Sequence, residues 1–267
     1  MRTVKGRSSY SGSAARLRVK TEVDVPAKRA LYQFTSLVLV VSLVGPVALA
    51  ADFWIEKAYD HWSAKETDRM LEESPWATTL SLGSVQTDIT SGDRPTNTKY
   101  RGEMETNPTI SYTLQFRSAE PIREAQVRSF QLKSHYDAMS ADQKAAFDAN
   151  ASKFLAVKFP DHVVVAVTFK TNVQDYEGVL RAYWGRQNLA TLAMSTFLDA
   201  GKQRLSLLEY SVKENTFQFT FPRPQQLNSN EKIAVEFIHP KVNVIGQQRI
   251  LQEFNLKKMQ VNGQPVF

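Results

Sequence analysis

The sequence predicts a mainly β fold with inserted helices (α+β). We expect an antiparallel β-sandwich-like domain with an N-terminal helix and a helical hairpin between its early strands. Three observations predict it. Short stretches of alternating apolar and polar residues, separated by turn signals, dominate the chain after residue 160. Two earlier segments begin with capping-box patterns, which favour helices. The regular strand–helix alternation of a doubly wound sheet is missing.

The first helix is expected from about Ala64 to Glu73. Ser63 and Glu66 form a capping-box pattern, in which the serine oxygen accepts a backbone N–H and the glutamate reaches back. Ser74-Pro75 should end this helix, because a residue before proline avoids the helical conformation. Alternating apolar residues then predict a strand from Ala77 to Ile89.

The clearest half-buried strand covers Ile110–Phe116, where apolar and polar residues alternate strictly. The polar segment 90–108 before it is rich in Gly, Pro, Asn and Thr and predicts a long surface loop.

A helical hairpin is expected after this strand, over about 120–154. Glu120-Pro121 opens its first helix, since proline is tolerated in a first helical turn. Ser140 repeats the capping-box pattern at the start of the second helix. A strand over 124–128 is the alternative for the first helix, because apolar and polar residues alternate there.

Strand signals dominate the remainder of the chain. Val163–Val167 is a continuous apolar run, typical of a strand buried on both faces, and one short helix is expected over Asp175–Arg186. The further strands are expected at Leu189–Leu198, at Arg204–Tyr210, through Phe217, Phe219 and Phe221, at Ile233–Ile238, at Phe254–Val261 and at Gln264–Phe267. The last two flank Asn262-Gly263, a strong hairpin signal because both residues tolerate positive φ.

The net charge of +6 lies in the first 50 residues. They hold eight basic and two acidic residues, whereas residues 51–267 hold 25 of each sign. The sequence pI near 9.4 is therefore no sign of a nucleic-acid-binding domain, and no nucleic-acid partner is expected. The chain has no cysteine, which excludes disulfides, thiolate metal sites and a cysteine nucleophile.

Residues 1–50 predict a basic n-region followed by a secretory signal peptide. Lys28-Arg29 precedes 22 uncharged residues, and the apolar stretch Leu37–Ala51 is shorter than the roughly 20 residues of a membrane span. Ala48-Leu49-Ala50 matches a small-x-small cleavage site. We therefore expect export to the periplasm or the extracellular space. The alternative is an uncleaved single-pass anchor in the inner membrane, and membrane contact is expected only through this segment.

The predicted organisation thus has three parts. Residues 1–50 form the leader, 51–76 an aromatic-rich helical segment, and 77–267 a β-rich domain with the helical insertion at about 120–154.

Motifs of known chemistry are missing from the sequence. The four histidines, His61, His135, His162 and His239, are too far apart for a local metal-binding pair. No G-x-S-x-G, G-x-G-x-x-G or phosphate-binding P-loop pattern occurs. No catalytic residue is assigned, and neither a cofactor nor a metal is expected. A carboxylate pair or a spatially assembled His/Asp/Ser set stays open, because sequence does not show which side chains share a cleft.

Aromatic residues are concentrated in the segment 51–76, just before the β-rich domain. Five of them lie within 24 residues, including three of the four tryptophans, Trp54, Trp62 and Trp76. These three are the candidate binding residues, as a stacking platform for sugar rings or as an anchor for a protein partner. The structural alternative is that they attach the first helix to the sheet.

The stretches Trp62-Ser63-Ala64-Lys65-Glu66 and Ser74-Pro75-Trp76-Ala77 follow the leader closely. This arrangement resembles that of a family of uncharacterised exported bacterial proteins, and the resemblance covers about a third of the chain after residue 50. It implies bacterial export and carries no activity and no site residues.

The sequence therefore predicts an exported protein of the bacterial envelope that binds or scaffolds a protein or glycan partner without catalysis. A secreted hydrolase and a membrane-anchored form of the same domain are the alternatives.

Overall fold

The computed structural model describes residues 53–83, 107–225, 227, 231–261 and 263–267. The chain divides into two units, Met1–Ala50 and Ala51–Phe267, and the described residues belong to the second. The expected leader, the end of the first strand and most of the expected surface loop lie outside the described residues. Among the helices that the structure describes, none has the length and apolar character needed to cross a membrane.

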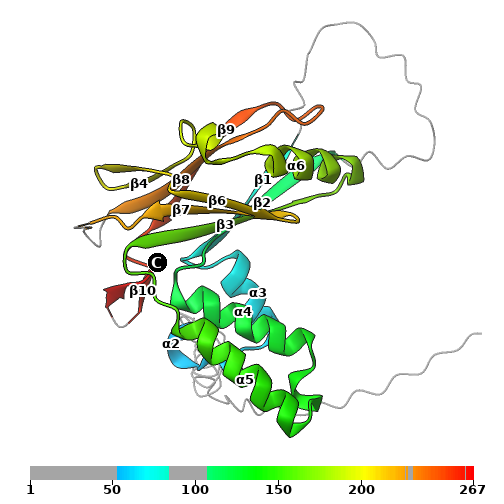
Figure 1. The fold of residues 1–267 in the computed structure, drawn as a ribbon, viewed down its shortest axis with the longest axis vertical. Coiled ribbons are helices and arrows are strands. Elements are labelled where there is room, and N and C mark those ends of the chain that lie inside the picture. The colour runs from blue at the N-terminus through cyan, green and yellow to red at the C-terminus, as the bar shows by residue number, and fades with distance from the viewer. Residues whose placement is uncertain (1–52, 84–106, 226, 228–230, 262) are drawn as a thin grey trace, which may run out of the picture. The chain divides into compact units, whose positions relative to one another are not determined.

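Two antiparallel sheets form the β part of the protein (Figure 1). The five-stranded sheet has the order β1 (Ala77–Gly83), β2 (Thr109–Phe116), β3 (His162–Thr171), β7 (Thr216–Pro222), β6 (Glu209–Lys213). The four-stranded sheet has the order β5 (Gln203–Ser206), β4 (Phe197–Ala200), β8 (Lys232–His239), β9 (Gln248–Asn255). Two short strands, β10 (Gln260–Val261) and β11 (Gln264–Pro265), pair near the end of the chain.

The inner faces of the two sheets share an aromatic core. Alternation along β2 buries Tyr112 and Phe116 on the face that meets the other sheet. The Tyr112 and Phe237 ring centroids are 5.5 Å apart, and those of Phe116 and Phe254 are 4.8 Å apart, both in edge-to-face geometry. Such pairs stabilise a core beyond the area that they bury. The mainly β α+β class with its sandwich-like packing is therefore confirmed.

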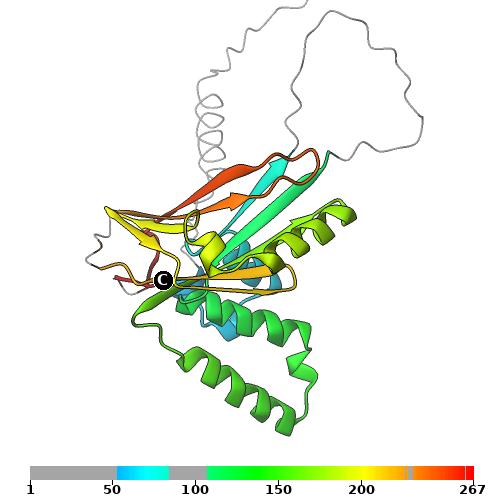
Figure 2. The same cartoon turned by 45° about the horizontal axis from the view of Figure 1, so that its top comes forward.

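Helices α3 (Ala64–Glu72), α4 (Glu120–Lys133) and α5 (Ala141–Ala156) lie on the other side of the five-stranded sheet (Figures 1 and 2). The predicted capping box of α3 is present, since Ser63 Oγ accepts the Glu66 N–H at 3.3 Å and Glu66 accepts the Ser63 N–H at 2.9 Å. Hydrogen bonds from Lys57, and then from Ser63, lower the pKa of Glu66 to about 2. The Gln115 side chain joins α3 to β2 by donating to the Leu71 carbonyl oxygen at 2.7 Å.

Helices α4 and α5 form the predicted hairpin between β2 and β3. The guanidinium of Arg123 on α4 is buried and donates to the carbonyl oxygens of Leu155 at 2.9 Å and Val157 at 2.6 Å. It thereby satisfies the C-terminal carbonyls that α5 leaves unpaired. The Tyr136 hydroxyl donates to the Asp148 carboxylate of α5, so the helix is held at two points although none of its own residues is buried.

Helix α6 (Gln174–Arg186) closes the core on the face of the five-stranded sheet that meets the four-stranded sheet, and its position matches the expected helix within one residue. Its Trp184 stacks on Phe217 with 3.9 Å between ring centroids. The Tyr210 hydroxyl donates to the Trp184 carbonyl oxygen at 2.7 Å. The remaining short helices are α2 (Phe53–Glu56), η1 (Tyr59–His61), η2 (Tyr136–Ala138) and α7 (Leu189–Leu192).

Several expected elements differ in the structure. The alternative strand over 124–128 is wrong, because these residues lie inside α4. The expected strand Leu189–Leu198 begins only at Phe197, since Asn188 and Thr191 cap each other and start α7. The expected strand Arg204–Tyr210 is divided between β5 and β6, which belong to different sheets.

The end of the chain also differs. Only Phe254 and Asn255 of the expected strand Phe254–Val261 extend a long strand, β9, and residues 256–259 turn toward β10. The expected hairpin is present as the two-residue strands β10 and β11, with Gly263 at φ +75° in its turn.

Candidate functional site

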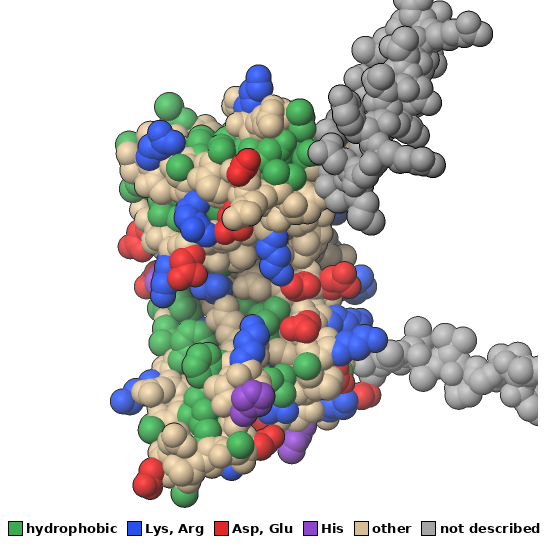
Figure 3. Space-filling view, turned by 90° about the vertical axis from the view of Figure 1, so that its right-hand side faces the viewer, with side chains coloured by type: hydrophobic (Ala, Val, Ile, Leu, Met, Phe, Trp, Pro, Cys, Tyr) green, Lys and Arg blue, Asp and Glu red, His purple; other side chains and the backbone are tan. Residues whose placement is uncertain are grey.

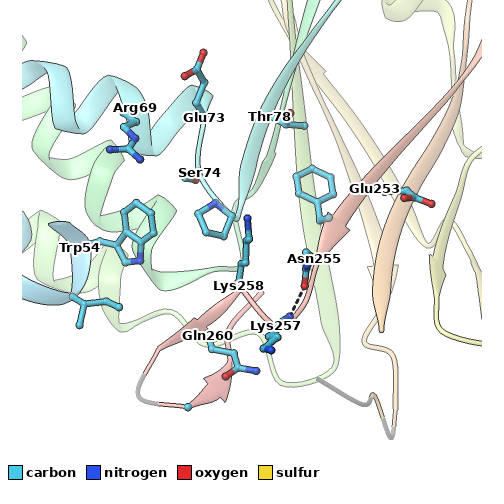
Figure 4. Close-up of a pocket in the computed structure, with 14 residues that line it drawn as sticks. Trp54, Arg69, Glu73, Ser74, Thr78, Glu253, Asn255, Lys257, Lys258 and Gln260 are labelled. Carbon is cyan, nitrogen blue, oxygen red and sulfur yellow. Dashed lines mark hydrogen bonds between the residues drawn. The ribbon is translucent and has the colours of Figure 1, made fainter. Parts of the chain in front are cut away.

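A groove of about 1010 Å³ opens between the N-terminal helices and the C-terminal segment (Figure 4). Trp54, Arg69 and Glu73 line it from α2 and from α3 with its C-cap. Lys257, Lys258 and Gln260 line it from the turn after β9 and from β10. The groove therefore combines residues separated by about two hundred positions in the chain.

The core tryptophan Trp76 connects the two walls. It is fully buried, and its indole N–H donates to the carbonyl oxygen of Val266 near the C-terminus. Its ring also meets the Trp54 ring edge-to-face, with 6.0 Å between centroids. Trp76 thus positions an aromatic residue of one wall while it holds the chain end that supports the other.

Trp62 supports the same wall from behind. It is 1% exposed, and its indole N–H donates to the Lys57 carbonyl oxygen at 3.1 Å. The centroids of the Trp62 and Phe53 rings are 5.4 Å apart. Phe53 in turn lies 5.0 Å from the Trp54 ring. The buried rings of Trp62 and Phe53 therefore restrict where the Trp54 indole can lie.

The structure separates the three candidate tryptophans into two roles. Trp62 and Trp76 lie in the core and are not accessible to a ligand, which is the structural alternative that the sequence left open. Trp54 is half-buried and lines the groove. An exposed platform made of all three tryptophans is therefore not formed, and Trp54 alone faces the opening.

Three cationic side chains enter the groove from both walls. Arg69 lies on α3, with its guanidinium 5.9 Å from the centre of the Phe53 ring. Lys257 and Lys258 lie in the turn after β9, where the Asn255 side chain accepts the Lys257 N–H at 3.0 Å. Within the described part of the chain, none of these three cations forms an ion pair with an acid. They are free to meet an anionic group of a ligand.

The groove also holds two carboxylates. Glu253 forms an ion pair with Lys232, with 2.5 Å between the charged atoms. Figure 4 shows the Glu73 and Glu253 side chains directed to different sides of the opening. The positive charge of the groove is therefore only partly offset by its own acids.

The sequence does not single out Lys257 and Lys258 as candidate binding residues, because two adjacent cations are common on any protein surface. The signal that marks them is the Asn255-Leu256-Lys257-Lys258 stretch, since an asparagine that caps its own turn fixes the direction of the residues after it.

The titratable groups that the structure describes outside the groove do not assemble into a metal site. Among the described residues, no three His, Asp or Glu side chains are grouped so that they could hold a metal ion. His239 is fully buried, and its Nδ1 atom lies 2.8 Å from the hydroxyl oxygen of Tyr112. Burial lowers the pKa of His239 to about 4. Burial and the neighbouring Glu120 raise the pKa of Glu124 to about 7, but Glu124 lies on α4 and does not line the groove.

Comparisons with known proteins add no function. No protein-family model matches the chain, and no curated protein matches it significantly. A solved structure, titled as a novel protein of unknown function from Burkholderia pseudomallei K96243, is similar over 53% of this chain and 73% of that chain. The identity is 10% and the TM-score is 0.35, so this likeness carries no argument about function.

Proposed function

We propose that the protein is an exported component of the bacterial envelope that binds a partner in this groove without transforming it. The observation that carries the proposal is Trp54, a half-buried aromatic residue at the wall of the groove. Its ring is held by Phe53 and Trp76, so little side-chain freedom is lost when a ligand stacks on it. Indole rings are favoured as anchors in binding sites.

The carboxylates of the groove favour binding over hydrolysis. A glycoside hydrolase needs two carboxyl groups about 5–9.5 Å apart, on either side of the bond that is cleaved. Of the two groove acids, Glu253 is engaged by Lys232, and Glu73 points to another side of the opening (Figure 4). The groove therefore offers side chains for holding a ligand rather than a pair for acid–base chemistry.

Binding without turnover is tested by calorimetric titration with a panel of envelope glycans, followed by product analysis. We expect saturable binding, no cleaved product, and at least about tenfold weaker binding by Trp54→Ala. Phe130→Ala is the matched control, since Phe130 is an exposed aromatic residue on α4 outside the groove. Sustained turnover of a glycan or an ester would overturn the proposal.

Export is supported by the basic n-region, the short apolar stretch and the small-x-small site of residues 1–50. N-terminal sequencing of the protein from the exported fraction tests it. A chain that begins at Ala51 supports cleavage. A chain that retains the apolar stretch favours the anchored form, with the same groove outside the membrane.

A further inference from the structure

We propose that the groove selects an anionic glycan, an oligosaccharide whose sugar rings carry carboxylate or phosphate groups. This inference rests on the proposed binding function and adds the chemical class of the ligand. It is carried by the juxtaposition of one accessible indole, that of Trp54, with three cations that form no ion pair among the described residues, those of Arg69, Lys257 and Lys258.

The cations approach a ligand from two directions. Figure 4 shows Arg69 on the helical wall beside Trp54, and Lys257 and Lys258 on the C-terminal segment. A guanidinium presents parallel donors that match a carboxylate or a phosphate, whereas each ammonium acts as a point charge. A ligand with repeated negative groups can therefore contact both walls at once. Each exposed ion pair is weak in water, so selectivity requires several of them together.

The acidic groups that face the groove do not cancel this charge. Glu253 is already neutralised by Lys232, which leaves Glu73 as the one unpaired acid among the described lining residues. Three cations against one free carboxylate give the groove a net positive field, although residues 51–267 as a whole hold equal numbers of acidic and basic residues. The charge is thus local to the groove.

Trp54 supplies the second half of the recognition. A sugar ring packs its C–H face against an indole, and the ring of Trp54 is kept in place by Phe53 and Trp76. The Gln260 amide on the C-terminal wall offers both a donor and an acceptor for sugar hydroxyls. The volume of about 1010 Å³ exceeds what most drug-sized ligands need, so a short oligosaccharide has room.

A nucleic acid would also combine stacking with phosphate contacts, but residues 51–267 hold as many acidic as basic residues, which argues against it. Proteins that follow a phosphate backbone carry an extended basic stripe. On the face shown in Figure 3, Lys and Arg side chains are interspersed with Asp and Glu side chains. A local basic groove with a single accessible indole suits a short anionic glycan better.

The test uses the full protein and four probes: a galacturonate hexasaccharide, its neutral methyl ester, a phosphorylated mannan oligosaccharide and an oligothymidylate of equal charge. We expect the galacturonate or the phosphomannan to bind at least about tenfold tighter than the methyl ester, with affinity that falls as salt rises. Which of the two anionic glycans binds tighter identifies the source of the negative charge.

Variants assign the selectivity to residues. The double variant Lys257→Gln/Lys258→Gln should lose about tenfold in affinity for the acidic glycan and leave the methyl ester unchanged. Trp54→Ala should weaken both alike. Lys213→Gln/Lys241→Gln is the matched control, since these two exposed lysines lie outside the groove. All substituted residues except Trp54 are exposed, and thermal unfolding of each variant verifies the fold.

Each outcome supports or overturns the inference. Equal affinity for the acid and its methyl ester, with loss of both in Trp54→Ala, overturns charge selection and leaves the binding function intact. Tighter, lysine-dependent binding of the oligothymidylate overturns the glycan assignment. Failure of all four probes to bind overturns it as well. Cleavage of a bound glycan would instead contradict the non-enzymatic function, even if charge selectivity is found.

Discussion

Lowering the pH should destabilise the protein through His239, in a defined window. The ring is fully buried at the end of β8, hydrogen-bonded to Tyr112 and in edge-to-face contact with it. Burial lowers its pKa from 6.5 to about 4. Protonation would place a charge in an aromatic core, and Nε2 has no hydrogen-bond partner among the described residues to stabilise that charge.

The size of the effect follows from the two pKa values. The unfolded chain takes up the proton near pH 6.5, and the folded protein takes it up only near pH 4. Above pH 7 both states carry a neutral ring, so His239 does not affect stability there. As the pH falls from 6.5 to 4, the free energy of unfolding falls by about 1.4 kcal/mol per pH unit, which amounts to about 3 kcal/mol in total.

The assay is urea unfolding followed by tryptophan fluorescence between pH 7.5 and pH 4.5. Tyr112→Phe/His239→Phe is the variant, because it removes both hydrogen-bond partners and keeps aromatic rings in the core. We expect the stability of this variant relative to the native protein to rise by about 2–3 kcal/mol across the range. Glu124 acts with the opposite sign, since a raised pKa gives stability as the pH falls. It is present in both proteins, so its effect cancels.

His61→Asn is the control, because the His61 side chain is 78% exposed, and its profile should follow that of the native protein. A difference between the double variant and the native protein that stays constant from pH 7.5 to pH 4.5 would refute the reasoning. It would mean that the folded protein protonates His239 as easily as the unfolded chain does.

Two further predictions concern the helices. Arg123→Met should cost about 2 kcal/mol, because the C-terminal carbonyls of α5 lose a charged donor, and hydrogen exchange should accelerate in α5 but not in β3. Unchanged exchange in α5 would contradict this role of Arg123. Ser63→Ala should lower the free energy of unfolding by about 1 kcal/mol, because it removes the N-cap of α3, and Ser211→Ala on the exposed face of β6 serves as its control. Equal losses in both serine variants would show that the cap is not the cause.

Local signals explain which helices were predicted well. The capping boxes at Ser63 and Ser140 place the starts of α3 and α5 at the residue where the structure has them. A cap is a contact between residues three positions apart, so the sequence contains all of it. β9 lacks such a signal, because most of its residues between Gln248 and Asn255 are polar or charged and few are buried. Pairing with β8 makes it a strand, and that contact lies outside any local window.

The candidate site was predictable only in part, for the same reason. The concentration of tryptophans marks the region, but the choice of Trp54 over Trp62 and Trp76 depends on which rings the rest of the fold covers. Trp76 is buried against a distant part of the chain, where its indole N–H donates to the carbonyl oxygen of Val266, 190 positions away. No spacing within residues 53–76 contains that information.

The structural and the functional interpretations of this aromatic cluster are therefore compatible. Phe53, Trp62 and Trp76 are buried, and their contacts leave the Trp54 ring little freedom before any ligand arrives. A ring that is already ordered loses less entropy on binding than a free one, so in the proposed binding mode the buried tryptophans would increase affinity without touching the ligand. Trp76 contacts the Trp54 ring and also holds the C-terminal segment that follows Lys257 and Lys258, so this core residue joins the two walls of the groove. In the proposed binding mode, core packing and ligand selectivity thus depend on one group of side chains.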